Sequence, residues 1–157
     1  MKTALALLLA AALLGACGDE AAPPGPPPDV FVFDSGGAHH IQGHGAWRVT
    51  ASRDGRFQAV HDVRGDETVY DEVVLEPPAR AILWAAIDSA GIDTLTASAR
   101  AGVPDEAELT FRLEKSTGET IEVQIWQNDA RRQLTLQPLL QELKIRIAET
   151  YGVRPVF

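Results

Sequence analysis

Two alternating runs of apolar and polar residues near the end of this 157-residue chain constrain its fold most strongly. The runs are AELTFRLEK at 107–115 and TIEVQIWQ at 120–127, and the turn-forming segment STGE separates them. Alternation with a period of two is typical of a strand with one buried face. The pattern therefore predicts an antiparallel hairpin. Its expected buried face consists of Leu109, Phe111, Leu113, Ile121, Val123 and Ile125.

Four further strands are expected earlier in the chain. The apolar run VFVF at 30–33 stops before Gly36-Gly37, and alternating runs occupy 46–52 and 56–63. Asp54-Gly55 lies between those two runs and predicts a type I′ hairpin turn, in which both central residues have positive φ. A polar turn, RGDE, then leads into TVYDEVVLEP at 68–77, which is expected to form one continuous fourth strand.

Two amphipathic helices are expected, one between the two groups of strands and one at the end. The first opens at Pro77-Pro78, where proline costs no hydrogen bond, and ends at Gly91. The second carries Pro138 in its first turn and ends at Tyr151-Gly152. The expected buried positions are Ala79, Ile82, Leu83, Ala86, Ile87 and Ala90 in the first helix and Leu136, Leu139, Leu140, Leu143 and Ile147 in the second.

These elements favour an α+β fold in the order ββββ-α-ββ-α. An antiparallel sheet of about six strands with two helices packed on one face buries every apolar stripe. The other face of the sheet, which carries Thr, Arg, Glu and Gln, is expected to meet water or a partner.

The N-terminal sequence predicts an exported protein. Lys2 precedes an apolar run from Ala4 to Leu14, the layout of a secretory signal peptide, and the run is too short to span a bilayer. The ending LGAC resembles the lipobox of bacterial lipoproteins, in which the cysteine is lipidated, and Cys17 is the only cysteine of the chain. The expected organisation is therefore a signal peptide at 1–16, a lipidated Cys17 opening a proline-rich tether at 17–29, and one domain at 30–157.

This organisation predicts where in the cell the protein resides. The domain is expected to lie in the periplasm or at the cell surface, held to a membrane by palmitate-type acyl chains. Gly18 rather than Asp follows the cysteine, which by resemblance to enterobacterial lipoproteins favours the outer membrane over the inner. Loss of Lys2 with the signal peptide takes the formal charge from −8 to −9, which argues against a nucleic-acid partner.

Asp34-Ser35-Gly36-Gly37 matches the tetrapeptide around the nucleophile of chymotrypsin-like proteases. No histidine precedes Ser35, whereas that family places its histidine and aspartate upstream of the serine. The interpretation is a strand end followed by a glycine turn. No nucleophile, base and electrophile can be assembled from the sequence, so an enzyme is not expected.

Histidines gather in the segment that follows. His39, His40 and His44 are candidate ligands for zinc, copper or nickel, but the surrounding glycines favour a loop that must lose entropy to present three ligands together. A polar loop without metal is the main interpretation, and a weak metal site is the alternative. His61 lies in an expected strand and is interpreted as a sheet residue. No cofactor is expected.

Three acidic motifs are interpreted as structural. Arg-Gly-Asp at 64–66 matches the integrin-binding tripeptide, but these residues are also common in turns. The adjacent carboxylates Asp71-Glu72 and Asp105-Glu106 would point to opposite faces of a strand. Neither pair is expected to form an acid/base dyad.

The layout of the domain resembles small bacterial lipoproteins and the emfourin-type inhibitors of metalloproteases. The resemblance is carried by a strand ending in Ser-Gly-Gly, by ILWAAIDSAGIDTL, by PDEAELTF and by the closing LLQEL. The hairpin around Asp54-Gly55 departs from the inhibitor plan, and no inhibitory residue is carried over. The expected function is a non-catalytic binding or assembly module for an envelope protein; the alternatives are a protease inhibitor and a weak metal binder.

Overall fold

The computed structural model describes residues 25–36, 44–103 and 106–157. These residues form seven strands and three helices, with a short 3-10 turn after the first helix. Their order broadly follows the expected ββββ-α-ββ-α, except that the fourth strand is divided and a short helix precedes the last one. The strands are β1 (Val30–Ser35), β2 (Ala46–Ser52), β3 (Arg56–Val63), β4 (Asp66–Val69), β5 (Val73–Val74), β6 (Glu108–Glu114) and β7 (Thr120–Trp126). The helices are α1 (Pro77–Ala90), the 3-10 turn η1 (Ile92–Thr94), α2 (Gln127–Ala130) and α3 (Leu136–Tyr151).

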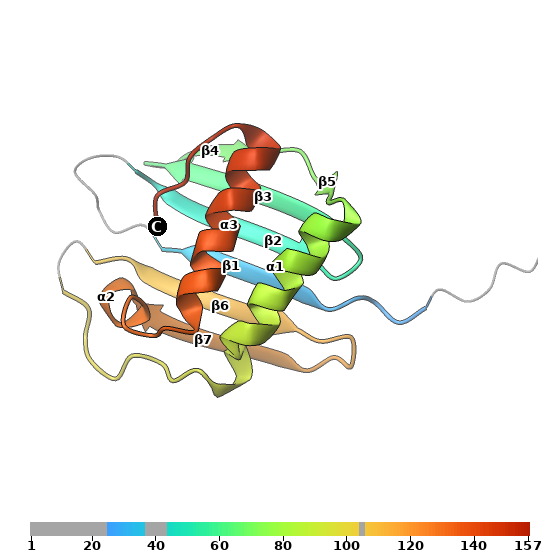
Figure 1. Ribbon diagram of the computed structural model, residues 1–157. Helices are drawn as coiled ribbons and strands as arrows, with labels where there is room; N and C mark the ends of the chain where they lie inside the picture. The colour runs from blue at the N-terminus through green and yellow to red at the C-terminus, as the bar shows by residue number, and fades with distance from the viewer. Residues whose placement is uncertain (1–24, 37–43, 104–105) are drawn as a thin grey trace, which may run out of the picture.

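The sheet is antiparallel throughout, with the strand order β4-β3-β2-β1-β6-β7, and β5 pairs with β3 beyond the break in β4. β1 therefore lies inside the sheet, between the two hairpins. Figure 1 shows α1 and α3 side by side across one face of the sheet. The α+β architecture expected from the sequence, with two helices packed on one face, is confirmed.

The core lies between the helices and the sheet. Phe31 and Phe33 of β1, Phe111 of β6, and Leu139 and Leu143 of α3 are fully buried. Burying a side chain of this size stabilises a fold by roughly 1.5–3 kcal/mol relative to leaving it exposed. Residues of the sheet that alternate with these face the opposite side, which none of the described helices covers (Figure 1).

Helix boundaries follow the proline and glycine signals. Pro77 and Pro78 occupy the first turn of α1, and Gly91 caps it at φ 62° and ψ 54°. The helix face differs from the expected one, because Ile82 is 55 % exposed whereas Trp84 is buried. Trp84 Nε1 donates to Ser52 O at 3.1 Å, so the indole packs against the end of β2 with its polar group satisfied.

The turn expected at Asp54-Gly55 differs from the one observed. Of Asp54 and Gly55, only Gly55 has positive φ (112°), so the β2–β3 hairpin closes through three residues rather than through a type I′ turn. The Asp54 carboxylate accepts the Arg56 N–H at 3.2 Å, which stabilises this longer loop. Positive φ at both central residues occurs in the next turn instead, at Arg64 (61°) and Gly65 (90°).

The fourth strand is also divided, although one continuous strand was expected. Tyr151, at the end of α3, donates its hydroxyl to Asp71 O at 3.0 Å and to Phe57 O at 3.3 Å. Its ring stacks on that of Tyr70, with 4.8 Å between centroids. Between β4 and β5 the Tyr70 N–H still donates to Ala59 O at 3.0 Å, and the contacts from α3 begin at the next residue, Asp71.

Candidate functional site

A hollow of about 340 Å³ lies on the open face of the sheet, near the end of β1 that leads into the β1–β2 connection. Gly36 directly follows β1 and Ala46 begins β2, and they leave space at this end of the sheet because neither carries a large side chain. The polar side chains around this hollow come from five strands, β1, β2, β3, β4 and β6. They are Asp34, Arg48, Asp62, Glu67 and Thr110.

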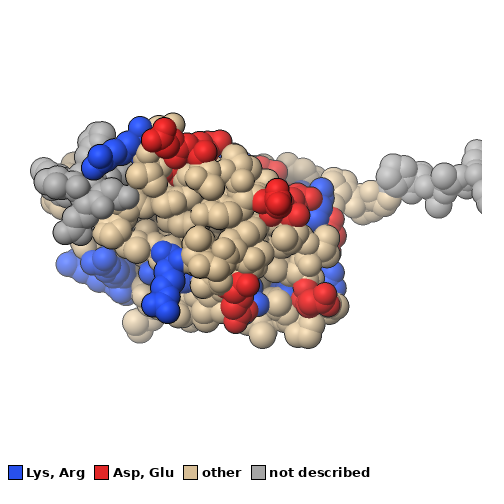
Figure 2. Space-filling model, turned by 90° about the horizontal axis from the view of Figure 1, so that it is seen from above, with Lys and Arg blue, Asp and Glu red and all other residues tan. Residues whose placement is uncertain are grey.

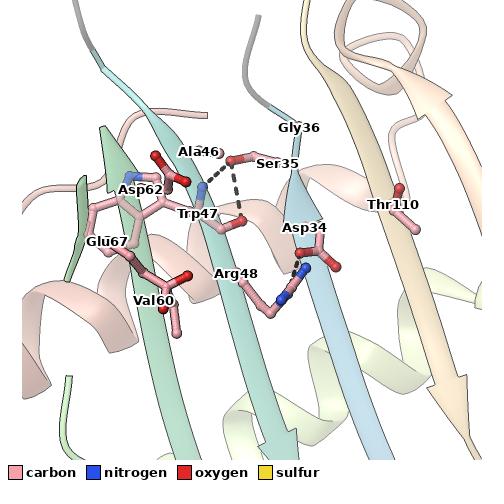
Figure 3. A pocket seen from close by; sticks show the side chains of 10 residues that line it. All are labelled: Asp34, Ser35, Gly36, Ala46, Trp47, Arg48, Val60, Asp62, Glu67 and Thr110. Carbon is pink, nitrogen blue, oxygen red and sulfur yellow. Dashed lines mark hydrogen bonds and ion pairs between the residues drawn. The ribbon is translucent and has the colours of Figure 1, made fainter. Parts of the chain in front are cut away.

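Figure 3 shows how these side chains lie. Arg48 Nε donates to Asp34 Oδ1 at 2.6 Å across the β1–β2 pair. Asp62 Oδ1 accepts the Gly65 N–H at 2.7 Å and so holds the β3–β4 turn. Glu67 forms no hydrogen bond or ion pair with any residue that the structure describes. The Glu67 carboxylate is therefore free to pair with a ligand, whereas the side chains of Asp34, Arg48 and Asp62 are engaged within the domain.

Ser35 is placed differently from a protease nucleophile. Its side chain points to the helix side of the sheet and is buried, with 3 % of the residue exposed. Its Oγ accepts the Trp47 N–H at 2.9 Å (Figure 3). This hydroxyl secures the end of β1 against β2, which agrees with interpreting Asp34-Ser35-Gly36-Gly37 as the end of a strand.

The histidine candidates are only partly described. His39 and His40 lie outside the described residues, as does Cys17. The ring of His61 stacks on Trp47 with 4.1 Å between centroids, and its Nε2–H donates to His44 O at 2.8 Å. Within residues 25–36, 44–103 and 106–157, no three His, Cys, Asp or Glu side chains are grouped so that they could hold a metal ion.

Both ends of the β1–β2 connection are held by specific contacts. Gly36 N donates to Glu108 O at 2.6 Å, and His44 O accepts the His61 ring N–H. Gly45 has a φ of 69°, and a Cβ there would lie 2.2 Å from Asp62 O, so the chain returns to β2 through a position that only glycine suits. The connection between Gly36 and His44 therefore leaves and re-enters the domain at fixed points.

A second polar cluster, which the sequence did not reveal, fixes the segment before β6. Glu106 has a side chain that is 2 % exposed. Its two oxygens accept two N–H groups of Arg100, at 2.7 and 2.5 Å, and the backbone N–H groups of Val103 and Asn128. The hydrogen bonds from Arg100 are the main cause that lowers the pKa of Glu106 to about 2.

Asp129 completes this cluster by accepting the Ser98 hydroxyl at 2.6 Å and the Arg100 guanidinium at 3.0 Å. The hydrogen bond from Ser98 is the first cause that lowers the pKa of Asp129. Every carboxylate oxygen of Glu106 is occupied, so the cluster is a structural clasp rather than an acid/base site. Asp105, its neighbour in sequence, lies outside the described residues.

The Arg64-Gly65-Asp66 tripeptide forms the exposed β3–β4 turn. Asp71 and Glu72 are exposed between β4 and β5, where neither faces the open-face hollow. Across the described part of the chain, no helix is both long and apolar enough to cross a bilayer. Comparison of the sequence with protein-family models and with curated proteins finds no match. The function is therefore inferred from the geometry of the domain itself.

Proposed function

We propose that this protein is a lipid-anchored, non-catalytic binding module of the cell envelope, and that it holds its partner on the open face of the sheet. The hollow at the end of β1 is the observation that carries the proposal. A sheet face without a covering layer, with a concave site and charges fixed by the fold, is suited to binding rather than to turnover.

The charged groups of the rim indicate the chemical character of the partner. Asp34 is paired with Arg48, and Asp62 is engaged by Gly65, but Glu67 remains available. A basic side chain of a partner segment would pair with Glu67 and the second oxygen of Asp62. Negative charge over the chain as a whole, −8, favours the approach of such a partner.

The position of the hollow relative to the tether supports this use. Asp29, the last tether residue, is fixed to the domain because its carboxylate accepts the Ser116 N–H at 2.7 Å and an Arg53 N–H at 3.2 Å. From there β1 runs six residues to the hollow, a length of roughly 20 Å. Asp29 and the hollow thus lie at opposite ends of β1, and a domain anchored through the chain before Asp29 would hold the hollow away from its attachment point.

The anchor and the site have separate tests. Cys17→Ser should move the protein from the membrane fraction to the soluble fraction and abolish acyl labelling. A variant that stays on the membrane, beside a wild type without acyl mass, would refute the anchor.

For the site, a photo-crosslinking residue at Thr110 should capture one partner in intact cells, and the same residue at Ile82, which is exposed on α1, should not. Glu67→Lys should abolish capture from position 110. Equal capture from both positions, or capture unaffected by Glu67→Lys, would contradict the proposal.

Protease inhibition on the same scaffold is the second candidate. An inhibitor must present a rigid segment to the protease cleft, and the fixed ends of the β1–β2 connection at Gly36 and His44 meet part of that requirement. Titration of the mature domain against thermolysin-like and serine proteases tests this candidate. Stoichiometric inhibition at sub-micromolar concentration would support it, and cleavage of the tether without inhibition would remove it.

Metal binding through the histidine segment is a third, weaker candidate. Calorimetry with zinc, copper and nickel compares the wild type with a variant in which His39, His40 and His44 are all alanine. Micromolar binding that is lost in the variant would establish a site. Metal-independent stability of both proteins would remove this candidate.

A further inference from the structure

A second cavity, of about 150 Å³, lies on the helix side of the sheet, between α3, the start of α2 and the C-terminal segment. It is separate from the open-face hollow and shares no lining residue with it. Its charged lining residues are Arg131 and Lys144, and none of its lining residues is acidic. That composition is unusual in a chain with 22 Asp and Glu against 14 Lys and Arg.

Neither cation has a carboxylate partner in the part of the chain that the structure describes. The Arg131 side chain forms no ion pair or hydrogen bond there, and Lys144 Nζ lies 5.0 Å from the centroid of the Phe157 ring without an ion pair. Burial, followed by the charge of Arg131, lowers the pKa of the Lys144 ammonium. Two like charges thus share one partly enclosed cavity whose described lining has no acidic side chain, and an anion bound there would stabilise both.

Arginine and lysine elsewhere in the domain are mostly paired. Arg48, Arg53, Arg56, Arg100, Arg112, Lys115 and Arg146 each form a salt bridge with a carboxylate. Figure 2 shows Lys and Arg side chains next to Asp and Glu side chains in several places on the face that it presents. Arg131 and Lys144 differ from these seven paired cations in having no carboxylate partner among the described residues.

The remaining lining gives the cavity a polar rim and an apolar wall. Side-chain amides of Gln127, Gln137 and Gln141 face it, and Gln137 Nε2 is already bound to Ala130 O at 3.0 Å. Leu109 and Phe157 form the apolar part, and the Phe157 ring is held by contact with Phe33 at 4.8 Å between centroids. Guanidinium, ammonium and amide N–H groups are the donors that carboxylate and phosphate oxygens accept.

We propose that this cavity binds a small organic oxyanion, with a carboxylate or phosphate head between Arg131 and Lys144 and a short apolar group against Leu109 and Phe157. The volume of about 150 Å³ accommodates a single ring or a short chain rather than a nucleotide. The site does not depend on the partner proposed for the open face, because the two lie on opposite faces of the sheet.

The test uses the mature domain, titrated at constant ionic strength and followed by amide NMR shifts. Benzoate and phenyl phosphate supply the head and the ring, inorganic phosphate supplies the head alone, and benzyl alcohol supplies the ring alone. Benzoate or phenyl phosphate should give saturable shifts around Lys144, Gln141 and Phe157, with a dissociation constant of about 0.1–10 mM, the range that ligand efficiency allows for so few atoms. Inorganic phosphate should bind more weakly, and benzyl alcohol should not saturate.

Substitutions identify the groups responsible. Arg131→Gln and Lys144→Gln should each weaken benzoate binding about tenfold, which corresponds to ~1.4 kcal/mol. Arg132→Gln is the matched control, because Arg132 is next in sequence but does not line this cavity. Gln141→Glu should abolish binding by placing a carboxylate at the rim. Thermal unfolding of each variant checks that the fold is retained, which is expected because no ion pair is lost.

Three results would overturn the proposal. Shifts that fail to saturate with every anion would show that no site exists. Unchanged binding in both Arg131→Gln and Lys144→Gln would place the anion elsewhere. An equal loss in Arg132→Gln would show that the attraction comes from general surface charge and not from the cavity.

Discussion

Replacing Gly102 by alanine should destabilise the domain, although the usual effect of such a change has the opposite sign. Gly102 lies in the segment before β6, and a Cβ built there would lie 2.6 Å from two atoms and 2.7 Å from a third atom of the Trp126 ring. Nonbonded carbon atoms normally approach to about 3.5–4.0 Å. The indole would therefore have to move by about 1 Å.

The surroundings of Trp126 oppose this movement. Its Nε1 donates to Arg100 O at 3.1 Å, and its backbone N donates to Ser98 Oγ at 3.0 Å. Moving the ring breaks the first contact. Moving the backbone at Gly102 instead strains the Glu106 clasp, which holds the residues on either side.

The magnitude follows from three contributions. Overpacking typically costs about 1–3 kcal/mol, and the hydrogen bond lost at Nε1 adds roughly 1 kcal/mol. Alanine gains about 0.4–1 kcal/mol by restricting the unfolded chain. Because the indole is partly exposed and can relax outward, the expected net loss in the free energy of unfolding is about 1–3 kcal/mol.

Urea unfolding followed by circular dichroism measures this loss. Trp126→Leu supplies the decisive comparison, since in that background Gly102→Ala should be neutral or stabilising. A coupling energy of about 1 kcal/mol or more between the two positions is expected for residues in direct contact. Gly25→Ala is the control, because an added Cβ there meets nothing within 4 Å. A wild-type-like or more stable Gly102→Ala protein would refute the reasoning.

Three further outcomes are expected. Glu106→Gln should reduce the stability of the fold at neutral pH and make that stability less dependent on pH in acid. With a folded pKa of about 2 against an unfolded value of 4.5, the carboxylate contributes stability above pH 4.5 that is lost as the pH falls toward 2. Acid unfolding followed by circular dichroism measures the pH dependence of the wild type and of the variant. Trp84→Ala should cost about 3–5 kcal/mol in urea unfolding, whereas Ile82→Ala, on the exposed side of the same helix, should stay within about 0.5 kcal/mol; similar losses for both would contradict the burial of Trp84 in place of Ile82. Ser35→Ala should cost about 0.5–1.5 kcal/mol through the contact with Trp47 N–H, and an unchanged urea midpoint would show that the hydroxyl is dispensable.

Local signals in the sequence determined most of the secondary structure. Alternating residues defined the β6–β7 hairpin, and prolines and glycines defined the helix boundaries at Pro77, Gly91 and Gly152. These signals act within a few residues, because side-chain direction, proline geometry and positive φ are properties of the local backbone. The α+β class followed from the apolar stripes, which need one another for burial.

Only the tertiary structure decided which strands are neighbours and which polar groups meet. β1 pairs with both β2 and β6, and that second pairing joins residues about eighty positions apart, for which the sequence holds no local signal. Glu106 became a buried acceptor because the fold brings Arg100 and the start of α2 to it. Trp84 replaced Ile82 in the core because the angle at which α1 lies on the sheet, rather than the helical period alone, selects the buried side.

Both candidate sites depend on the tertiary structure rather than on local signals in the sequence. The open-face hollow exists because the fold brings side chains of five strands together beside Gly36 and Ala46. The cavity proposed to bind an anion brings Arg131, which follows α2, and Lys144 of α3 to one place. In sequence these are ordinary residues of a turn and a helix. They line one cavity only because tertiary packing brings together segments that no local signal connects.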